Sequence, residues 1–241
     1  MARKNNGKEM KSKANELSLK ELQAVCFKES DCIIMGNYRK LSTRITMRLY
    51  KKGILPWQIT LAAFAVALVG AGLFLFGQYP YLVAGVLLLQ VSFILDCVDG
   101  EIARINKTGS PFGAWLDPTV DFYSTAAFMG AAAIGQYFLL NDAAFLIAGI
   151  PAVISFAMVS YMVSTRARYV EKSDLKPTVG ISSKRRIGNR GLSMALITVG
   201  ALTNQIFPLL LIFTVVWTGV WIKMVFDFYA LTKKLAEKNK A

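Results

Sequence analysis

Histidine is absent from this 241-residue chain, and cysteine occurs only three times. Cys26, Cys32 and Cys97 form no metal-binding motif, so no zinc site is expected. The scarcity of cysteine fits a reducing, intracellular-facing environment. The start of the chain also lacks the apolar segment and cleavage site of a signal peptide, because Lys- and Glu-rich sequence follows Met1. No cleaved leader is therefore expected.

Acidic residues are fewer than basic ones, 15 against 28, which gives a net charge of +13. Such a charge is also typical of nucleic-acid-binding proteins. However, the chain is 54% hydrophobic and contains several uninterrupted apolar runs. A membrane-crossing helix needs about 20 such residues, and helices satisfy their own backbone in lipid. We therefore expect an all-α polytopic membrane protein whose partner is the lipid bilayer, with no nucleic acid bound.

Six segments are predicted to be transmembrane helices, the fifth being short. They cover residues 56–76, 81–104, 113–137, 143–165, 191–203 and 206–228. The three connections on one side of the membrane, 77–80, 139–142 and 203–208, contain no Lys or Arg. All 28 basic residues then lie on the side of the two termini. The positive-inside rule makes this the cytoplasmic side, most simply of the plasma membrane.

Residues 37–53 are predicted to form an interfacial amphipathic helix before the first span. Two stripes recur at helical spacing: an apolar one of Tyr38, Leu41, Ile45 and Leu49, and a basic one of Lys40, Arg44, Arg48 and Lys51. Gly53 breaks this helix, and Pro56 suits the first turn of the next. The chain thus divides into a polar extension (1–36), the amphipathic helix (37–53), a six-helix domain (54–230) and a basic tail (231–241).

Four aspartates interrupt the apolar sequence of the second and third spans. They are Asp96, Asp99, Asp117 and Asp121. Residues three or four apart share a helix face, and the antiparallel spans bring both pairs to the cytoplasmic third of the membrane. Ionisable side chains inside a membrane are costly and usually functional.

Carboxylates at close quarters do not all stay ionised unless cations neutralise them. Oxygen ligands without His or Cys favour hard ions, so Mg²⁺ or Mn²⁺ is predicted, with Ca²⁺ as an alternative occupant. Two such ions held by aspartates suit phosphoryl transfer. Arg104, at the mouth of the same site, is positioned to bind phosphate. A divalent-cation transporter is the alternative, since it also needs intramembrane carboxylates.

The motif resembles that of a known family. Asp96-x-x-Asp99-Gly100-x-x-Ala103-Arg104, eight residues, and Gly113-x-x-x-Asp117-x-x-x-Asp121 match every fixed position of the CDP-alcohol phosphotransferase signature. The resemblance covers roughly residues 37–230 and implies transfer of a substituted phosphate group from a CDP-alcohol to an acceptor hydroxyl, with release of CMP. It also implies a homodimer.

The resemblance assigns roles to the matching positions. Asp96, Asp99 and Asp117 would ligate one metal ion; Asp121 would hold a second ion and act as general base. Gly100, Ala103, Arg104 and Gly113 would form the CDP pocket, to which Thr60 would contribute. The family often has Pro-Asn-x-Ile-Thr at the start of the first span, where this chain has Trp57 in place of Asn. That substitution questions a nucleotide contact there, and Gln58 is a candidate replacement.

The loop 166–190 is rich in Arg and Lys and is the predicted acceptor region. Arg168, Arg185, Arg186 and Arg190 are the candidates for binding a phosphorylated acceptor. Contact with anionic lipids is the alternative role for these charges. A loose resemblance of residues 31–45 to the inositol-phosphate-using members favours inositol phosphate as acceptor, with glycerol phosphate next and serine still open. The donor is CDP-diacylglycerol or a similar CDP-alcohol. Glu101 is predicted to be solvent-facing or paired with Lys or Arg.

Overall fold

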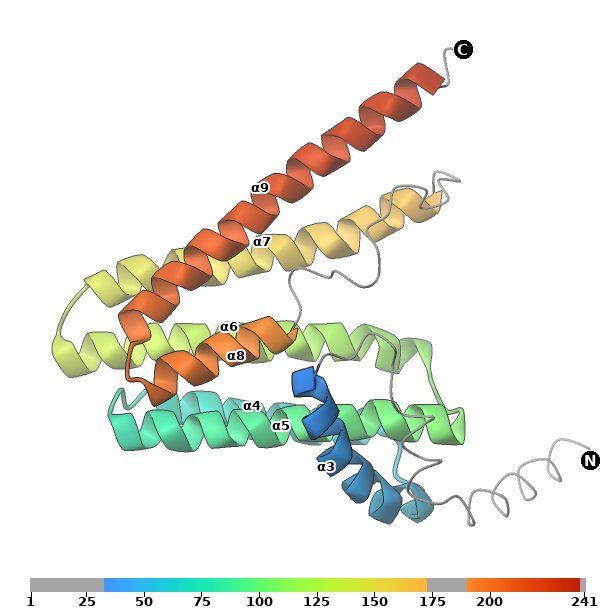
Figure 1. The fold of residues 1–241 in the computed structure, drawn as a ribbon, viewed down its shortest axis with the longest axis horizontal. Helices are drawn as coiled ribbons and strands as arrows, with labels where there is room; N and C mark the ends of the chain where they lie inside the picture. The colour runs from blue at the N-terminus through green and yellow to red at the C-terminus, as the bar shows by residue number, and fades with distance from the viewer. Residues whose placement is uncertain (1–32, 173–189, 239–241) are drawn as a thin grey trace, which may run out of the picture. The chain divides into compact units, whose positions relative to one another are not determined.

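The computed structural model describes residues 33–172 and 190–238. Within these residues the chain forms α-helices joined by short connections, together with one 3-10 helix (Figure 1). In chain order they are α3 (Ile33–Leu49), η1 (Tyr50–Lys52), α4 (Pro56–Phe74), α5 (Tyr79–Asn106), α6 (Pro111–Leu140), α7 (Ala144–Lys172), α8 (Arg190–Leu202) and α9 (Ile206–Lys238). The expectation of an all-α chain is thus confirmed for the described residues.

The helices end where residues adopt a left-handed backbone. Gly53, after η1, has φ of 71°, and Gly77, after α4, has φ of 68°. Asn141 and Asn204 follow α6 and α8 with φ of 51° and 55°. Glycine and asparagine tolerate this conformation best, which explains why they close helices here. The predicted turns at all four residues agree with the structure.

Within residues 33–172 and 190–238, four helices are long and apolar enough to cross a membrane: Pro56–Phe74, Tyr79–Asn106, Ala144–Val163 and Ile206–Ala230. They coincide with four of the six predicted spans. The helix α6 is 30 residues long but is not among these four, and α8 has only 13 residues. These properties make the chain an integral membrane protein with several apolar helices.

The described chain packs as two compact units, each containing parts of the long helices. The first comprises residues 33–66 and 90–120. Its apolar centre is formed by Ile59 of α4 with Val98 and Ile102 of α5. Side chains of α3, among them Ile45 and Leu49, pack against this centre. The unit therefore joins α3 to the stretch of α5 that carries Asp96 and Asp99.

The buried face of α3 differs from the predicted apolar stripe. Leu41, expected on that stripe, is 44% exposed. Instead, polar side chains of α3 are buried: Arg39, Ser42, Thr43 and Thr46. The periodicity of the apolar residues is therefore an incomplete guide, because α3 also has to supply hydrogen-bond partners to a polar group on α5, described below. Lys40, Arg44 and Arg48, of the predicted basic stripe, are exposed.

The second unit comprises residues 67–89, 121–172 and 190–238. Its helices approach closely at glycines: a Cβ atom on Gly135 of α6 would lie 2.1 Å from the carbonyl oxygen of Phe74. Beside it, Gln136 Nε2 donates a hydrogen bond of 2.6 Å to the Gly77 carbonyl. Aromatic rings fill the contact of α7 with α9, where the Phe156 ring of α7 lies 5.8 Å from Phe213 and 6.0 Å from Trp217 of α9. Small residues and aromatics thus set the packing of this unit.

Candidate active site

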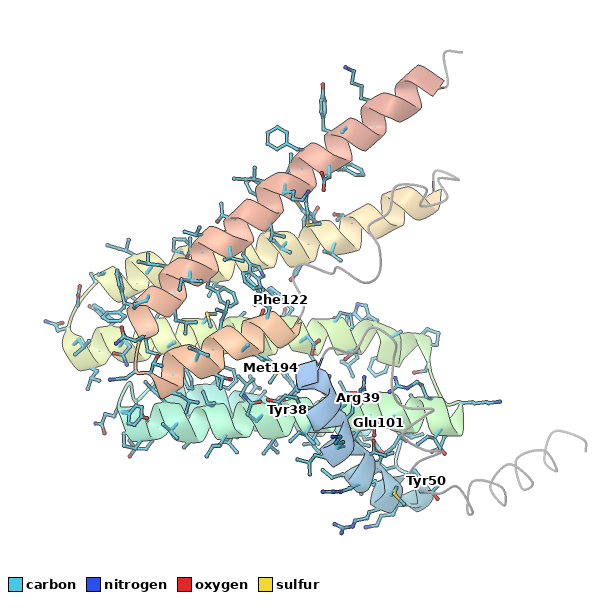
Figure 2. All side chains as sticks on the ribbon, viewed as in Figure 1. Tyr38, Arg39, Tyr50, Glu101, Phe122 and Met194 are labelled. Carbon is cyan, nitrogen blue, oxygen red and sulfur yellow. The ribbon has the colours of Figure 1, made fainter. Side chains whose placement is uncertain are left out.

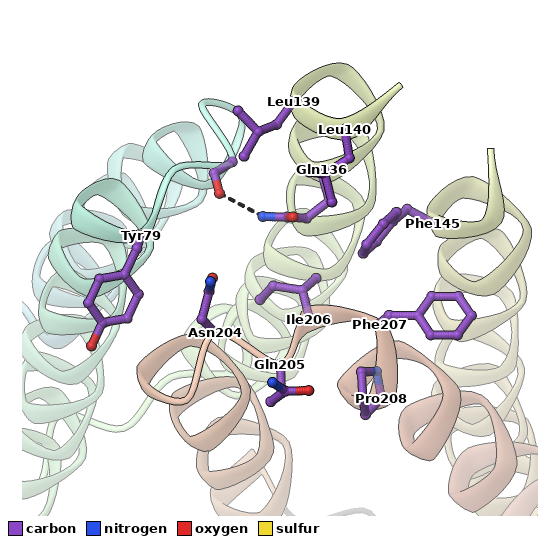
Figure 3. A pocket seen from close by; sticks show the side chains of 11 residues that line it. Tyr79, Gln136, Leu139, Leu140, Phe145, Asn204, Gln205, Ile206, Phe207 and Pro208 are labelled. Carbon is purple, nitrogen blue, oxygen red and sulfur yellow. Dashed lines mark hydrogen bonds between the residues drawn. The ribbon is translucent and has the colours of Figure 1, made fainter. Parts of the chain in front are cut away.

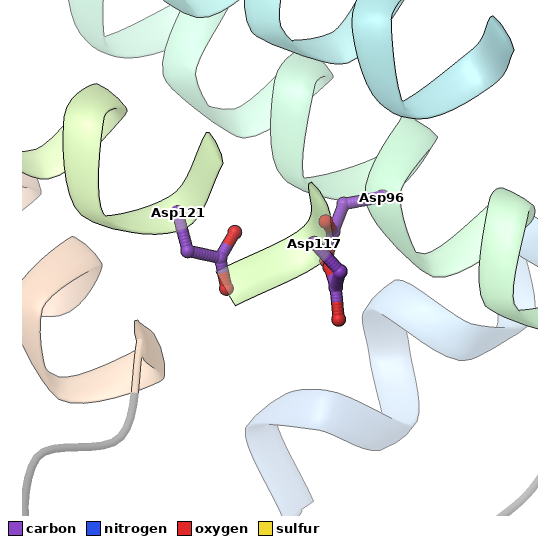
Figure 4. Close-up of side chains that lie close together, drawn as sticks. All are labelled: Asp96, Asp117 and Asp121. Carbon is purple, nitrogen blue, oxygen red and sulfur yellow. The ribbon is translucent and has the colours of Figure 1, made fainter. Parts of the chain in front are cut away.

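Carboxylates of α5 and α6 meet in the first unit. Single carboxylate oxygens of Asp96 and Asp117 lie within 4.8 Å of one another. Asp121 lies one turn beyond Asp117 on the same uninterrupted helix, and an oxygen of its side chain is also within 4.8 Å of Asp117 (Figure 4). Asp117 is exposed, whereas Asp96 and Asp121 are half-buried. An all-oxygen donor set at this spacing fits a hard divalent cation.

Asp99 lies on the same stretch of α5, but the structure gives its carboxylate a different neighbour. Asp99 is 7% exposed, and its Oδ2 accepts a hydrogen bond of 2.5 Å from Thr60 Oγ1 on α4. The Thr60 hydroxyl also lies 3.2 Å from the Pro56 carbonyl of its own helix. Asp99 is thus on the same stretch of α5 as Asp96 with its Oδ2 bonded to Thr60, and Thr60, predicted to contact CDP, here contacts an aspartate.

Gly100 and Arg104 lie one helical turn apart on α5 and are directly adjacent in space. A Cβ atom on Gly100 would approach Arg104 Nη1 to 3.3 Å. The glycine therefore leaves room for the guanidinium to lie along the helix. Arg104 Nε and Nη2 are buried and have no hydrogen-bond partner among the described residues. Guanidinium nitrogens in this state suit a phosphate oxygen, which would supply the missing acceptors.

The start of α6 is fixed by a side-chain cap. Ser110 Oγ accepts a hydrogen bond of 3.0 Å from the Gly113 amide, and Pro111 occupies the first helical position. A Cβ atom on Gly113 would meet only this hydroxyl, at 3.3 Å. The cap sets where α6 begins and therefore where Asp117 falls on it.

Three aromatic rings lie near the N-terminal ends of α4 and α6. Trp57, in place of the usual Asn, lies with its ring 6.3 Å from that of Phe112, which lies 6.1 Å from Trp115. Phe112 and Trp115 are 52% and 62% exposed. Gln58, also exposed, accepts a hydrogen bond of 3.1 Å from the Leu55 amide. Ala103 of the predicted CDP pocket is half-buried on α5.

The structure adds a polar site that the sequence pattern does not predict. Glu101 is fully buried, at 0% exposure, and is paired with Arg39 of α3 at 3.4 Å. The expectation that it faces solvent is wrong, whereas the alternative expectation of pairing with Lys or Arg is confirmed. The signal in the sequence is the run of Ser42, Thr43 and Thr46, three hydroxyl residues at helical spacing in a segment otherwise divided between apolar and basic stripes.

The predicted acceptor residues fall at or beyond the edge of what the structure describes. Arg185 and Arg186 lie outside the described residues. Arg168 lies in α7, and Arg190 is the first residue of α8. The structure thus places two of the four on helices and leaves the acceptor contacts as predictions.

A cavity of about 310 Å³ opens elsewhere, in the second unit (Figure 3). Its lining residues come from the ends of helices and the turns between them: Gly77, Tyr79, Gln136, Leu139, Leu140, Phe145, Asn204, Gln205, Ile206, Phe207 and Pro208. It contains none of the predicted site residues and no charged side chain. The candidate active site is therefore the aspartate cluster and not this cavity.

Known proteins are similar to this chain over most of its length. Residues 53–229 match the family model of the CDP-alcohol phosphatidyltransferases. The chain is 35% identical over 160 residues to a bifunctional IPC transferase and DIPP synthase of Rubrobacter xylanophilus, covering 62% of this chain and 34% of that protein. It is 30% identical to a phosphatidylinositol phosphate synthase of Mycolicibacterium smegmatis, covering 71% of this chain and 73% of the relative. The chain spans about a third or less of the length of the bifunctional relatives it matches.

Solved structures share the fold. A phosphatidylinositol phosphate synthase of Mycobacterium tuberculosis in complex with manganese and citrate has a TM-score of 0.58 and 25% identity, covering 77% of this chain and 88% of that one. The same protein with CDP-DAG bound also has a TM-score of 0.58, at 24% identity, covering 77% of this chain and 94% of that one. The family match favours a transferase over the cation transporter.

Proposed function

The chain belongs to the CDP-alcohol phosphatidyltransferase family, and we propose that it joins a CDP-alcohol to a phosphorylated polyol with release of CMP. The favoured donor is CDP-diacylglycerol or a similar lipid, and the favoured acceptor is inositol phosphate, with glycerol phosphate next. Phosphatidylinositol phosphate and archaetidylinositol phosphate synthases among its relatives support this acceptor. The product would be a phospholipid or a related lipid.

The observation that carries the proposal is the meeting of Asp96 and Asp117 within 4.8 Å, with Asp121 one turn beyond on the same helix. We assign Asp96, Asp99 and Asp117 to one divalent ion and Asp121 to a second. Mg²⁺ or Mn²⁺ is the expected ion, and Ca²⁺ would bind without supporting turnover. When bound, such ions neutralise charge on the transferring phosphate and its leaving oxygen. The manganese in the Mycobacterium tuberculosis relative supports divalent-metal use in this family.

Side chains and glycines of the protein would accept the proton, bind the phosphate and accommodate the nucleotide. Asp121 would accept the proton of the acceptor hydroxyl as that oxygen attacks the phosphorus on the alcohol side of the pyrophosphate. Arg104 would bind a phosphate oxygen through its Nε and Nη2 atoms, which have no partner among the described residues. Gly100, Ala103 and Gly113 would leave room for the nucleotide, and Thr60 would contribute from α4. CMP leaves, and its phosphate carries the negative charge that these groups had balanced.

The acceptor phosphate would be held by arginines of the region between α7 and α8. Arg168, Arg185, Arg186 and Arg190 are our candidates, because guanidinium groups bind phosphate through paired hydrogen bonds. The relatives named for inositol phosphate products support a phosphorylated acceptor.

We further propose a membrane arrangement of six spans, with α6 and α8 completing the four most apolar helices. In this arrangement α3 lies in the head-group layer with Lys40, Arg44 and Arg48 toward anionic lipid. The functional parts would be the extension 1–36, the interfacial helix 37–53, the transferase domain 54–230 and the tail 231–241. The active site and both termini would face the cytoplasm at the plasma membrane, and the protein would form a homodimer.

Release of CMP tests the function directly. Purified protein in liposomes is supplied with Mg²⁺ or Mn²⁺, one donor (CDP-diacylglycerol, CDP-archaeol or CDP-inositol) and one acceptor (inositol phosphate, glycerol phosphate, inositol or serine). We expect CMP and a phosphorylated lipid with inositol phosphate, and no reaction with excess chelator. Release of CMP only with serine or free inositol would refute the phosphorylated acceptor. Turnover in excess chelator would refute the metal-dependent mechanism.

A further inference from the structure

Glu101 is a buried acidic residue that the proposed chemistry does not use. Its side chain is 0% exposed, although it lies in one of the most apolar helices of the chain. Oε1 accepts a hydrogen bond of 2.6 Å from Ser42, and Oε2 accepts one of 2.6 Å from Thr46. Arg39 Nη1 lies 3.4 Å from Oε1 (Figure 2). Each carboxylate oxygen therefore has a hydroxyl partner, and a guanidinium balances the charge.

All three partners come from α3, and all are buried. Arg39 is 5% exposed, and Ser42 and Thr46 are 0% exposed. A second contact holds the same two helices further along, where Tyr38 donates a hydrogen bond of 2.5 Å to Gln90 Oε1. The Tyr38 ring also meets the Phe93 ring edge-on at 5.1 Å. Because Gln90, Phe93 and Glu101 all contact α3, these contacts define the face of α5 that packs on it.

The opposite side of α5 carries Asp99. Residues two apart on a helix point about 200° from one another, so Glu101 and Asp99 face nearly opposite directions. On that other side Asp99 accepts the hydrogen bond from Thr60 of α4. The same turn of α5 is thus held from two directions by polar contacts. Rotation of α5 in either sense would lengthen one of them, which fixes the directions of Asp96, Asp99 and Arg104.

We propose that Glu101 is a positioning residue for the phosphotransfer site, acting through its contacts with Ser42, Thr46 and Arg39. Its contacts set the rotation of α5 and hence the geometry that the aspartates offer to a divalent ion. The inference rests on the proposed function, because only a metal-dependent site needs this geometry. Side chains that orient metal ligands from outside the ligand set usually change metal affinity by about 10–100-fold when removed.

The first test replaces Glu101 with Gln, which keeps the shape but gives one of the two hydroxyls a donor instead of an acceptor. Mn²⁺ binding is measured by electron paramagnetic resonance on folded protein in detergent, and the Mn²⁺ concentration for half-maximal CMP release is measured separately. We expect E101Q to weaken Mn²⁺ binding by about tenfold or more and to raise the Mn²⁺ concentration for half-maximal CMP release by a similar factor. Wild-type Mn²⁺ affinity in folded E101Q would overturn the proposal.

A matched pair of α3 variants controls for substitutions that only prevent folding. Thr46→Val removes the hydroxyl that reaches Glu101. Thr43→Val removes a hydroxyl of equal burial, 0% exposed, whose one hydrogen bond within the described part of the chain goes to the Arg39 carbonyl of its own helix at 2.7 Å. We expect T46V to weaken Mn²⁺ binding, although less than E101Q does, and T43V to match the wild type.

The outcomes separate this inference from the proposed function. Equal Mn²⁺ affinity in T46V, T43V and wild type would overturn the positioning role even if all three release CMP. Failure of E101Q, T46V and Ser42→Ala to fold, with T43V folded, would also overturn it, because these contacts would then serve folding alone. If wild-type protein binds Mn²⁺ but releases no CMP from any donor, the proposed function fails, whereas the Mn²⁺ spectra still decide the role of Glu101.

Discussion

Thr60 of α4 donates a hydrogen bond of 2.5 Å to Oδ2 of Asp99 on α5, linking two residues 39 positions apart in the chain. Asp99 is almost fully buried, so this hydroxyl satisfies a carboxylate oxygen that water does not readily reach. The contact ties the start of α4 to the acidic turn of α5. It also gives Thr60 a role in orienting Asp99 that is separate from nucleotide binding.

Thr60→Val should therefore weaken metal activation. If Asp99 is a metal ligand, loss of the hydrogen bond that orients it should raise the Mn²⁺ concentration for half-maximal CMP release by about 10–100-fold. Thr60→Ser keeps the hydroxyl and should restore most of the affinity. Thr203→Val is the control, because the Thr203 hydroxyl, just after α8, bonds among the described residues only to the Val199 and Gly200 carbonyls. An increase in donor KM with unchanged metal dependence would instead assign Thr60 to the nucleotide.

Asp121→Asn should lower CMP release by about 10²–10⁴-fold, the usual effect of removing a general base. The amide keeps the size of the side chain but cannot take the proton from the acceptor hydroxyl. Asp142→Asn is a matched control, because Asp142 caps α7 through the Ala144 amide at 2.9 Å and Asn caps equally well. Initial rates on protein of equal elution volume and thermal stability measure the effect. Activity within a few-fold of wild type would rule out the general-base role.

Gly100→Ala should impair donor binding through Arg104. The added Cβ atom would lie 3.3 Å from Nη1, so the guanidinium has to shift by a few tenths of an ångström. We expect the KM for the CDP-alcohol to rise several-fold, while stability changes by less than about 1 kcal/mol because alanine favours helix. Gly72→Ala makes the same change on α4, where the Cβ atom would meet nothing within 4 Å. Equal donor KM in the two variants would contradict the proposed fit of Gly100 to Arg104.

Gly135→Ala should destabilise the second unit without altering any proposed catalytic residue. Its Cβ atom would lie 2.1 Å from the Phe74 carbonyl oxygen, and neither backbone can easily give way. Overpacking of this kind costs about 1–3 kcal/mol, which a lower midpoint of thermal unfolding in detergent would reveal. Gly130→Ala, on the same helix, has open space around its Cβ atom and should leave the midpoint unchanged or slightly higher. Equal midpoints would show that α4 and α6 do not pack this closely.

Much of the helical architecture is predictable from local chemistry. Apolar runs of membrane length predict α4, α5, α7 and α9, and Asn141 and Asn204 predict the turns after α6 and α8. The four-residue spacing of Asp117 and Asp121 is enough to place both on one helix face. These features depend on neighbours within a turn or two, so the sequence contains all the information they require.

The contacts between helices are not predictable in the same way. Hydrophobic periodicity identifies which residues avoid water, but it cannot identify which polar residues meet inside. Glu101 therefore has the pattern of a surface residue, and only the placement of α3 beside α5 supplies Ser42, Thr46 and Arg39 as its partners. Conversely, Leu41 has the spacing of a buried residue but is exposed, because periodicity does not specify what packs against a helix face.

Residue types at fixed spacing along one chain are sufficient to identify the family, the helices and the acidic motif. The hydrogen bond of Asp99 to Thr60 and the enclosure of Glu101 by α3 depend instead on how the helices pack in three dimensions. Those pairings join residues 39 to 62 positions apart. Burial makes each polar group require a partner, and only the packing of the helices determines which partner it finds.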